Sequence, residues 1–298
     1  MSAIVDRPRS AAFEPELARR RLKGTLFLGA CVAAIGITLL VLLFLLLDIL
    51  GRGLPALDLA FLTSGPSRRP DQAGVMPALA GSILMAVIVG IVTFPIGVGA
   101  AIFLREYATD TFISRLLRTN IANLAGVPSI IYGIFGLALF VRALSLGFTL
   151  VAGALTLSLL ILPVVIIASI EALDAVPSGQ REGAYALGAT RWQMVRGTVL
   201  PAAGPGILTG IILAMARAIG ETAPLILVGA VGFVSYLPRP FDGGYTVLPI
   251  QVYQWASRPQ EEFQALAATG IIVILVLLFV LNLAAVTIRI RLTRHLQW

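Results

Sequence analysis

The sequence predicts an all-α integral membrane protein with six transmembrane helices. Hydrophobic residues make up 58% of its 298 residues and charged residues only 12%, a balance outside the range of soluble domains. A helix needs about 20 mostly apolar residues to cross the ~30 Å hydrocarbon core of a bilayer. Runs of this length occupy residues 24–47, 78–104, 121–143, 149–170, 204–230 and 267–288. They are long and continuous, whereas the strands of a membrane β-barrel alternate over about ten residues, so a helical bundle is expected.

One membrane domain with two short tails accounts for the whole chain. Residues 1–23 form a basic N-terminal tail, residues 24–290 the transmembrane domain and residues 291–298 a C-terminal tail. Fifteen of the 22 basic residues fall in the tails or in the loops after the second and fourth runs, against six in the opposite loops. By the positive-inside rule, both termini and the loop 171–203 are therefore cytoplasmic.

The first apolar run is expected to stay in the protein as an uncleaved helix. It is too long for a signal-peptide core and lacks a convincing small-residue cleavage site. The outer loop 48–76, rich in Gly, Pro and Arg, is expected to be an exposed connector.

Three residue types occur once each, and this excludes several chemistries. Cys31 is the only cysteine, His295 the only histidine and Lys23 the only lysine. An intrachain disulfide and a zinc site of His and Cys ligands are therefore excluded. A phosphate-binding loop of the Walker type needs Gly-Lys-Ser/Thr, but Lys23 lies between Leu22 and Gly24. We expect no catalytic residue, no metal site and no cofactor in this chain.

The loop 171–203 contains an interrupted amphipathic helix that begins at about Ser178, just after Pro177. Gly183, Ala184 and Gly188 make a flat surface that another protein could approach closely. The charged residues expected around it are Arg181, Glu182, Arg191 and Arg196. The residues expected on one common side are Ala184, Leu187, Gly188, Met194 and Val195. A helix lying among lipid headgroups would show the same periodicity, so periodicity alone leaves both interpretations open.

The fifth run contains two ionisable residues, Arg217 and Glu221, at membrane depth. Such residues are costly in a bilayer and are functional candidates by default, and their i, i+4 spacing places them on one helix face. The same face is expected to carry Gly206, Gly210, Leu213, Gly220 and Pro224. An ion pair that pins two helices explains these charges, and so does a translocation path in which Arg217 attracts an anion. In the second case Glu221 orients Arg217 or accepts a hydrogen bond from a protonated substrate oxygen.

Two further stretches have two interpretations each. The segment Gly126–Ser129 is either a simple break in the third run, because Pro128 removes a backbone donor, or part of a conduit lining. The candidate conduit residues are Pro128, Ser129 and Tyr132. Residues 248–256, with Tyr253 and Trp255, lie either at the outer headgroup level or against an external protein.

The pattern Glu182-Gly183-Ala184-x-x-x-Gly188, followed after nine residues by Thr198-x-Leu200-Pro201, resembles the EAA loop of ABC importer permeases. Glycine replaces the first alanine of that motif, and threonine replaces the usual aliphatic residue. The resemblance implies the MetI-like bundle of type I importers, whose short helix inserts into a groove of an ATP-binding subunit and transmits its closure. The implied coupling residues are Glu182, Gly183, Ala184, Gly188, Leu200 and Pro201.

The segment 217–225 (RAIGETAPL) is similar to that of phosphate-specific ABC transporter permeases, in particular their A-type subunit, and the stretches 126–138 and 248–268 agree. The resemblance implies transport of inorganic phosphate past Arg217, Glu221 and Thr222. It also implies four kinds of partner: a homologous C-type permease, two ATP-binding subunits that use ATP and Mg, an extracytoplasmic phosphate-binding protein and membrane lipid. The net charge of +7 reflects membrane orientation and requires no nucleic acid.

Alternatives from other classes stay open at this level. Competition by other anions in a transport assay would distinguish a permease for sulfate, molybdate or phosphonate from one for phosphate. A secondary anion carrier could use the Arg217/Glu221 pair, but it would have no need for the pattern at 182–201. A membrane-embedded enzyme acting on lipid would need a nucleophile–base pair, which does not accompany these residues.

Overall fold

The computed structural model describes residues 14–230 and 233–294, and the chain separates into two compact units, Met1–Gly51 and Arg52–Trp298. Part of the N-terminal tail, with Arg7 and Arg9, and His295 lie outside the described residues. Helix α1 (Glu14–Gly53) supplies the described part of the first unit. Its 40 residues extend beyond the predicted run 24–47 at both ends and, at 1.5 Å rise per residue, give a length of about 60 Å.

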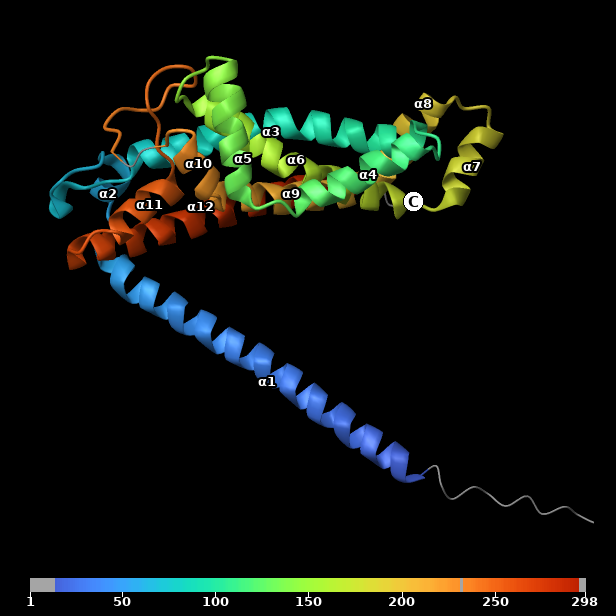
Figure 1. Cartoon of the computed structure of the whole chain (residues 1–298), viewed down its shortest axis with the longest axis horizontal. Helices are drawn as coiled ribbons and strands as arrows, with labels where there is room; N and C mark the ends of the chain where they lie inside the picture. The colour runs from blue at the N-terminus through green and yellow to red at the C-terminus, as the bar shows by residue number, and fades with distance from the viewer. Residues whose placement is uncertain (1–13, 231–232, 295–298) are drawn as a thin grey trace, which may run out of the picture. The chain divides into compact units, whose positions relative to one another are not determined.

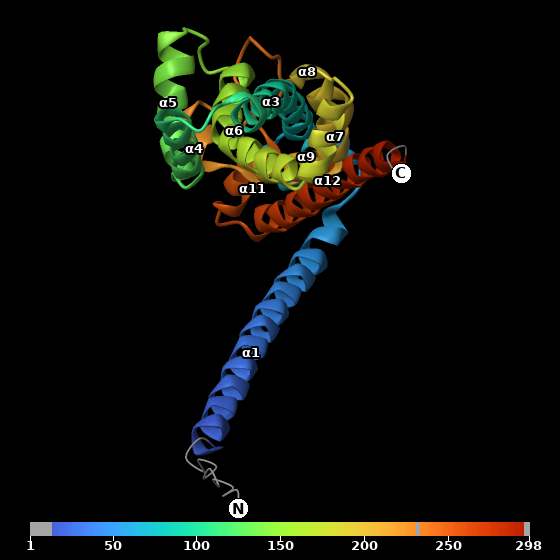
Figure 2. The same ribbon diagram turned by 90° about the vertical axis from the view of Figure 1, so that its right-hand side faces the viewer.

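The second unit is a bundle of four long helices: α3 (Met76–Ile102), α6 (Leu150–Asp174), α9 (Leu200–Gly220) and α12 (Glu261–Arg294). They run side by side in Figure 1 and are seen nearly end-on in Figure 2. Helix α6 packs against α3 and α9, and α12 packs against α9. Leu157, Ile161 and Val165 of α6 are almost fully buried in the resulting core. Four of the five described helical segments that are long and apolar enough to cross a membrane thus form the bundle.

Glycines let α6 and α9 approach closely. A Cβ at Gly206 would come 2.8 Å from Cβ of Ala172, and one at Gly210 would come 2.5 Å from Cβ of Ala168. These two glycines of the predicted face therefore lie against a neighbouring helix. Farther along α9, however, the predicted face is not packed against a neighbouring helix. The Leu213 side chain is 67% exposed, and Gly220 borders open space.

The third apolar run is broken at Gly126–Ser129, which confirms the interpretation of this segment as a break, so the run 121–143 is not one continuous helix. Helix α4 (Phe112–Ala125) and helix α5 (Ser129–Gly136) meet at 103°, and α5 continues as a wide turn over Leu137–Ala143. Pro128 causes the break because it has no N–H and adopts an extended ψ of 134° immediately before α5. The Tyr132 hydroxyl fixes the bend by donating to the Leu124 carbonyl at 2.9 Å.

The fifth run also ends earlier than predicted. Helix α9 stops at Gly220, and helix α10 (Ala223–Leu227) follows after two residues. Helix α10 packs against α5, where a Cβ at Gly133 would come 2.7 Å from Cα of Pro224. Within the described ranges, five helical segments are long and apolar enough to cross a membrane, and the α4–α5 pair makes a sixth if it counts as one span. The predicted all-α, six-helix membrane fold is confirmed.

The end of the bundle that carries α2 (Leu59–Thr63) and α11 (Leu248–Ala256) has an apolar core of its own. The rings of Phe61 and Trp255 lie 5.7 Å apart, and Val75 is fully buried beside them. The expectation that 48–76 is an exposed connector is therefore wrong. Trp255 is 1% exposed and contacts neither lipid headgroups nor an external protein, whereas Tyr253 is 57% exposed.

The loop 171–203 lies at the opposite end of the bundle (Figure 1). It forms α7 (Ser178–Ala186) and α8 (Arg191–Met194), and a wide π turn over Val195–Val199 leads into α9. A second π turn, Phe103–Tyr107, extends α3 at this end. Two candidate sites therefore lie in different parts of the unit, one at the break after α9 and one on the α7 loop.

Candidate functional site

The break after α9 interrupts the helix at the charged residues. Arg217 lies in the last turn of α9, Glu221 follows in an extended conformation (φ −72°, ψ 129°), and Thr222 precedes α10. Non-helical backbone at membrane depth is tolerated only where protein buries it or where it lines a hydrated space. Discontinuous helices of this kind form the binding sites of many transporters.

Arg217 and Glu221 form an ion pair of unequal exposure. Nε of Arg217 lies 3.3 Å from Oε1 of Glu221, and the two side chains are 48% and 16% exposed. Among the described residues, Glu221 is the only hydrogen-bonding partner of Arg217, so both terminal nitrogens keep their donors. The carboxylate thus holds the guanidinium from one side while its fork remains open. This fork suits an oxyanion.

The other predicted residues near the break differ in accessibility. Thr222 is half-buried, and its hydroxyl lies 3.5 Å from the Gly220 carbonyl. Tyr132 is buried, but its phenol lies close enough to Arg217 for electrostatic interaction. Pro128 is exposed and Ser129 half-buried at the start of α5. The structure therefore groups Arg217, Glu221, Thr222 and Tyr132.

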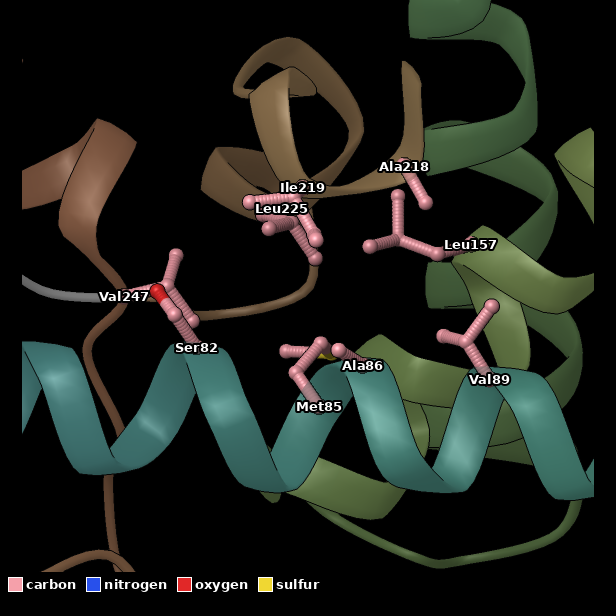
Figure 3. Close-up of a pocket in the computed structure, with 9 residues that line it drawn as sticks. All are labelled: Ser82, Met85, Ala86, Val89, Leu157, Ala218, Ile219, Leu225 and Val247. Carbon is pink, nitrogen blue, oxygen red and sulfur yellow. The ribbon is translucent and has the colours of Figure 1, made fainter. Parts of the chain in front are cut away.

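A cavity beside the break is too small for an anion. Its lining residues are Ser82, Met85, Ala86, Val89, Leu157, Ala218, Ile219, Leu225 and Val247 (Figure 3). Their side chains converge on a space of about 10 Å³, enough for one water at most. An ion passing Arg217 would have to use the outer side of α9 rather than the interior of this chain.

An apolar groove of about 630 Å³ lies between α3, α9 and α12. Helix α3 contributes Ile91 and Phe94, and helix α9 contributes Met215 and Ile219. Because these two α9 residues lie two positions before and after Arg217, they occupy the opposite face of the helix, and Arg217 does not line the groove. The groove is therefore separate from the charged break.

The α7 loop exposes the other set of predicted residues. Glu182 and Gly183 are exposed and Ala184 is half-buried, whereas Leu200 and Pro201 are half-buried at the start of α9 and do not join this surface. A Cβ at Gly183 or Gly188 would meet no atom within 4 Å, so both positions border open space. We call Glu182, Gly183, Leu187 and Gly188 the α7 surface.

The side chains of this loop do not share one side as expected. Met194 and Val195 are buried at 2% and 0% exposure, but Leu187 is 91% exposed. Leu187 points outward because the chain reverses at Gly188, whose φ is +81°. Arg181 is also not a surface charge, since its side chain is only 13% exposed and pairs with Glu106. Helical periodicity missed the first feature because the chain reverses at Gly188, and it missed the second because the partner of Arg181 lies on the extension of α3.

We expect Gly188→Ala to loosen the turn that ends α7. A positive φ costs a residue with a Cβ about 1–2 kcal/mol, whereas Asn tolerates this region better. The Gly188 and Ala189 amides, which donate to the carbonyls of Tyr185 and Ala184, should then exchange with deuterium about 5- to 30-fold faster in Gly188→Ala. Gly188→Asn should exchange more slowly than Gly188→Ala, and equal rates in wild type and both variants would contradict this account.

Among the residues that the structure describes, no group of three or more His, Cys, Asp or Glu side chains could hold a metal ion. The ionisable groups at the break and on the α7 surface are therefore considered as ligands for an anion or for a protein surface.

Residues 93–294 match the model of a family described as binding-protein-dependent transport system inner membrane component. The chain is 33% identical over 297 residues to phosphate transport system permease protein PstA 1 of Mycobacterium tuberculosis strain H37Rv, covering 98% of this chain and 96% of the relative. It is 35% identical over 262 residues to PstA of Mycobacterium leprae, covering 86% and 85%. It is 33% identical over 269 residues to the probable ABC transporter permease protein YqgI of Bacillus subtilis, covering 86% and 90%.

Solved structures share the fold. A chain of a bacterial alginate ABC transporter superposes with a TM-score of 0.63 at 14% identity, covering 92% of this chain and 98% of that chain. A chain of the inward-facing MetNI methionine ABC transporter gives a TM-score of 0.57 at 21% identity, covering 74% and 94%.

Proposed function

Because this chain belongs to the family of binding-protein-dependent transport system inner membrane components, we propose that it is the permease subunit of an ATP-driven importer of inorganic phosphate. The observation that carries the substrate class is the half-exposed Arg217, whose terminal donors are open and whose Nε is held by Glu221. Two relatives that match most of the chain are named phosphate transport system permease proteins, which supports phosphate, rather than another oxyanion, as the substrate.

Phosphate would pass Arg217 on the exposed face of α9 at the break. The guanidinium fork offers two parallel donors to phosphate oxygens, while Glu221 orients the fork and limits its net attraction for the anion. Thr222 adds a hydroxyl at the same break. Pro128 and Ser129 would line the conduit, and the buried Tyr132 would support its wall from behind. Weak binding suits transport because the ion must also leave.

The exposed face of α9 that carries Leu213 and Arg217 is proposed to receive the homologous C-type permease, which would complete the path between the two chains. One of two ATP-binding subunits would dock on the α7 surface and the other on the corresponding loop of the C-type permease. These subunits would bind ATP and Mg and carry out hydrolysis, so this chain itself is proposed to be non-catalytic and without a cofactor. An extracytoplasmic phosphate-binding protein would deliver the ion. The chain is a multi-pass membrane protein. We propose that residues 24–290 lie in the cytoplasmic (inner) membrane and that both tails, 1–23 and 291–298, lie in the cytoplasm.

Transport would follow alternating access. Closure of the ATP-binding subunits would pull the two α7 loops together and open the path outward, and hydrolysis would reset it.

Purification of the tagged chain from its native membrane, followed by mass spectrometry and uptake into proteoliposomes, tests this proposal. We expect an ATP-binding subunit and a second permease to co-purify, and radiolabelled phosphate uptake to require ATP and the binding protein. Competition by sulfate, molybdate or a phosphonate instead of phosphate would identify a different oxyanion. Uptake by the isolated chain without ATP would show a secondary carrier and would contradict the proposal.

A further inference from the structure

Three consecutive residues at the end of α3 hold three different parts of the α7 loop region. Arg105 pairs with Asp174 at the end of α6, Glu106 pairs with Arg181 of α7, and the Tyr107 ring lies 5.6 Å from the Arg191 guanidinium of α8. All three belong to the π turn Phe103–Tyr107. The end of α3 therefore contacts the loop before, within and after helix α7.

The Glu106–Arg181 pair is the best shielded of these contacts. Its side chains are 5% and 13% exposed, and Oε1 of Glu106 accepts from Nη2 and Nε of Arg181 at 2.9 and 3.3 Å. The guanidinium also donates to the carbonyls of Leu173 and Val176 at 2.7 and 2.6 Å. One side chain of α7 thus binds both the end of α6 and the extension of α3.

Exposed pairs elsewhere in the same unit are looser. Arg115–Asp110 is separated by 3.8 Å and Arg239–Asp242 by 3.7 Å, and all four side chains are at least 68% exposed. Water and salt screen such pairs, so they hold no fixed geometry. A buried pair whose hydrogen bonds are all made keeps its geometry when one of the elements is displaced.

We propose that Glu106 and Arg181 form the rigid link that carries displacement of α7 to α3, which makes them positioning residues for energy coupling. The inference rests on the proposed function. Helix α7 joins α6 through the short turn at Ala175–Pro177 and would tilt about it when a partner pulls on the α7 surface. With Arg181 bound on both sides, α7, the end of α6 and α3 move together. Helix α3 in turn packs on α6 and also contacts α9, the helix that carries Arg217.

The test uses the complete transporter in proteoliposomes with its binding protein, and measures ATP hydrolysis and phosphate uptake in the same vesicles. Glu106→Gln keeps the size and an acceptor oxygen but removes the charge. We expect this variant to assemble and hydrolyse ATP, while the phosphate moved per ATP falls about fivefold or more. Arg181→Lys, which keeps the charge but loses the fork, should show a loss in the same direction.

Asp110→Asn is the matched control, since it removes one carboxylate charge from an exposed pair four residues further along. Its phosphate-to-ATP ratio should equal that of wild type. A wild-type ratio in assembled Glu106→Gln would overturn the inference, as would failure of both Glu106→Gln and Arg181→Lys to assemble, because the pair would then serve folding alone. Failure of the proposed function is a separate result, since wild-type vesicles would then take up no phosphate.

Discussion

Arg217→Ala is expected to abolish phosphate uptake, with a loss of at least about 100-fold, while the transporter still assembles. The variant loses the guanidinium fork, and it leaves the Glu221 carboxylate, 16% exposed, as an unpaired negative charge beside the path. A hydrogen bond to a charged group typically contributes about 1.5–3 kcal/mol, so losing both terminal donors of Arg217 corresponds to a factor of about 100 or more in uptake. Radiolabelled phosphate uptake per amount of purified complex measures the effect.

Two further variants separate the roles of the pair. Arg217→Lys keeps the charge without the fork and should give intermediate uptake. In Arg217→Ala/Glu221→Ala the repulsive carboxylate is gone as well, so recovery of near-normal uptake would show that Arg217 only neutralises Glu221 and would remove the anion-binding role. Arg239→Ala serves as the control, because Arg239 is 77% exposed in a loose surface pair and should not affect uptake.

Much of this site could be predicted from the sequence because its signals are local. The i, i+4 spacing of Arg217 and Glu221 places the two side chains within reach of each other even though α9 ends between them. Pro128 marks the break between α4 and α5 because proline has no backbone N–H to donate to the helix. Apolar length alone predicts the long helices, because crossing a bilayer sets their minimum size.

The features that the sequence did not reveal depend on contacts between distant segments. Glu106 and Arg181 are 75 residues apart, and neither lies in an apolar run that would mark it as buried. Trp255 resembles an interfacial aromatic until Phe61 and its neighbours from the loop 48–76 are seen to cover it. Leu187 faces outward only because Gly188 adopts a positive φ. Periodicity carries no information about any of these arrangements.

Leu187→Asp is expected to prevent the ATP-binding subunits from associating with this chain. Leu187 is 91% exposed at the end of α7, so the substitution removes almost no contact within the chain. Full burial of a leucine side chain contributes about 1.5–3 kcal/mol, and an aspartate forced into the same apolar contact adds a desolvation cost. Together these predict association weakened by at least about 100-fold, measured by co-purification and by binding of the isolated ATP-binding subunit to the permease pair.

The same variant distinguishes the two interpretations of α7. A docking helix needs Leu187 as an apolar anchor, so Leu187→Met should retain association and Leu187→Asp should lose it together with uptake. A helix that merely lies among lipid headgroups would leave subunit association unchanged in both variants. Thr109→Asp adds the same charge at another exposed position of this end of the bundle, outside the α7 surface, and should associate normally. Loss of association in Thr109→Asp as well would mean that added negative charge, rather than the missing anchor, disrupts the interface.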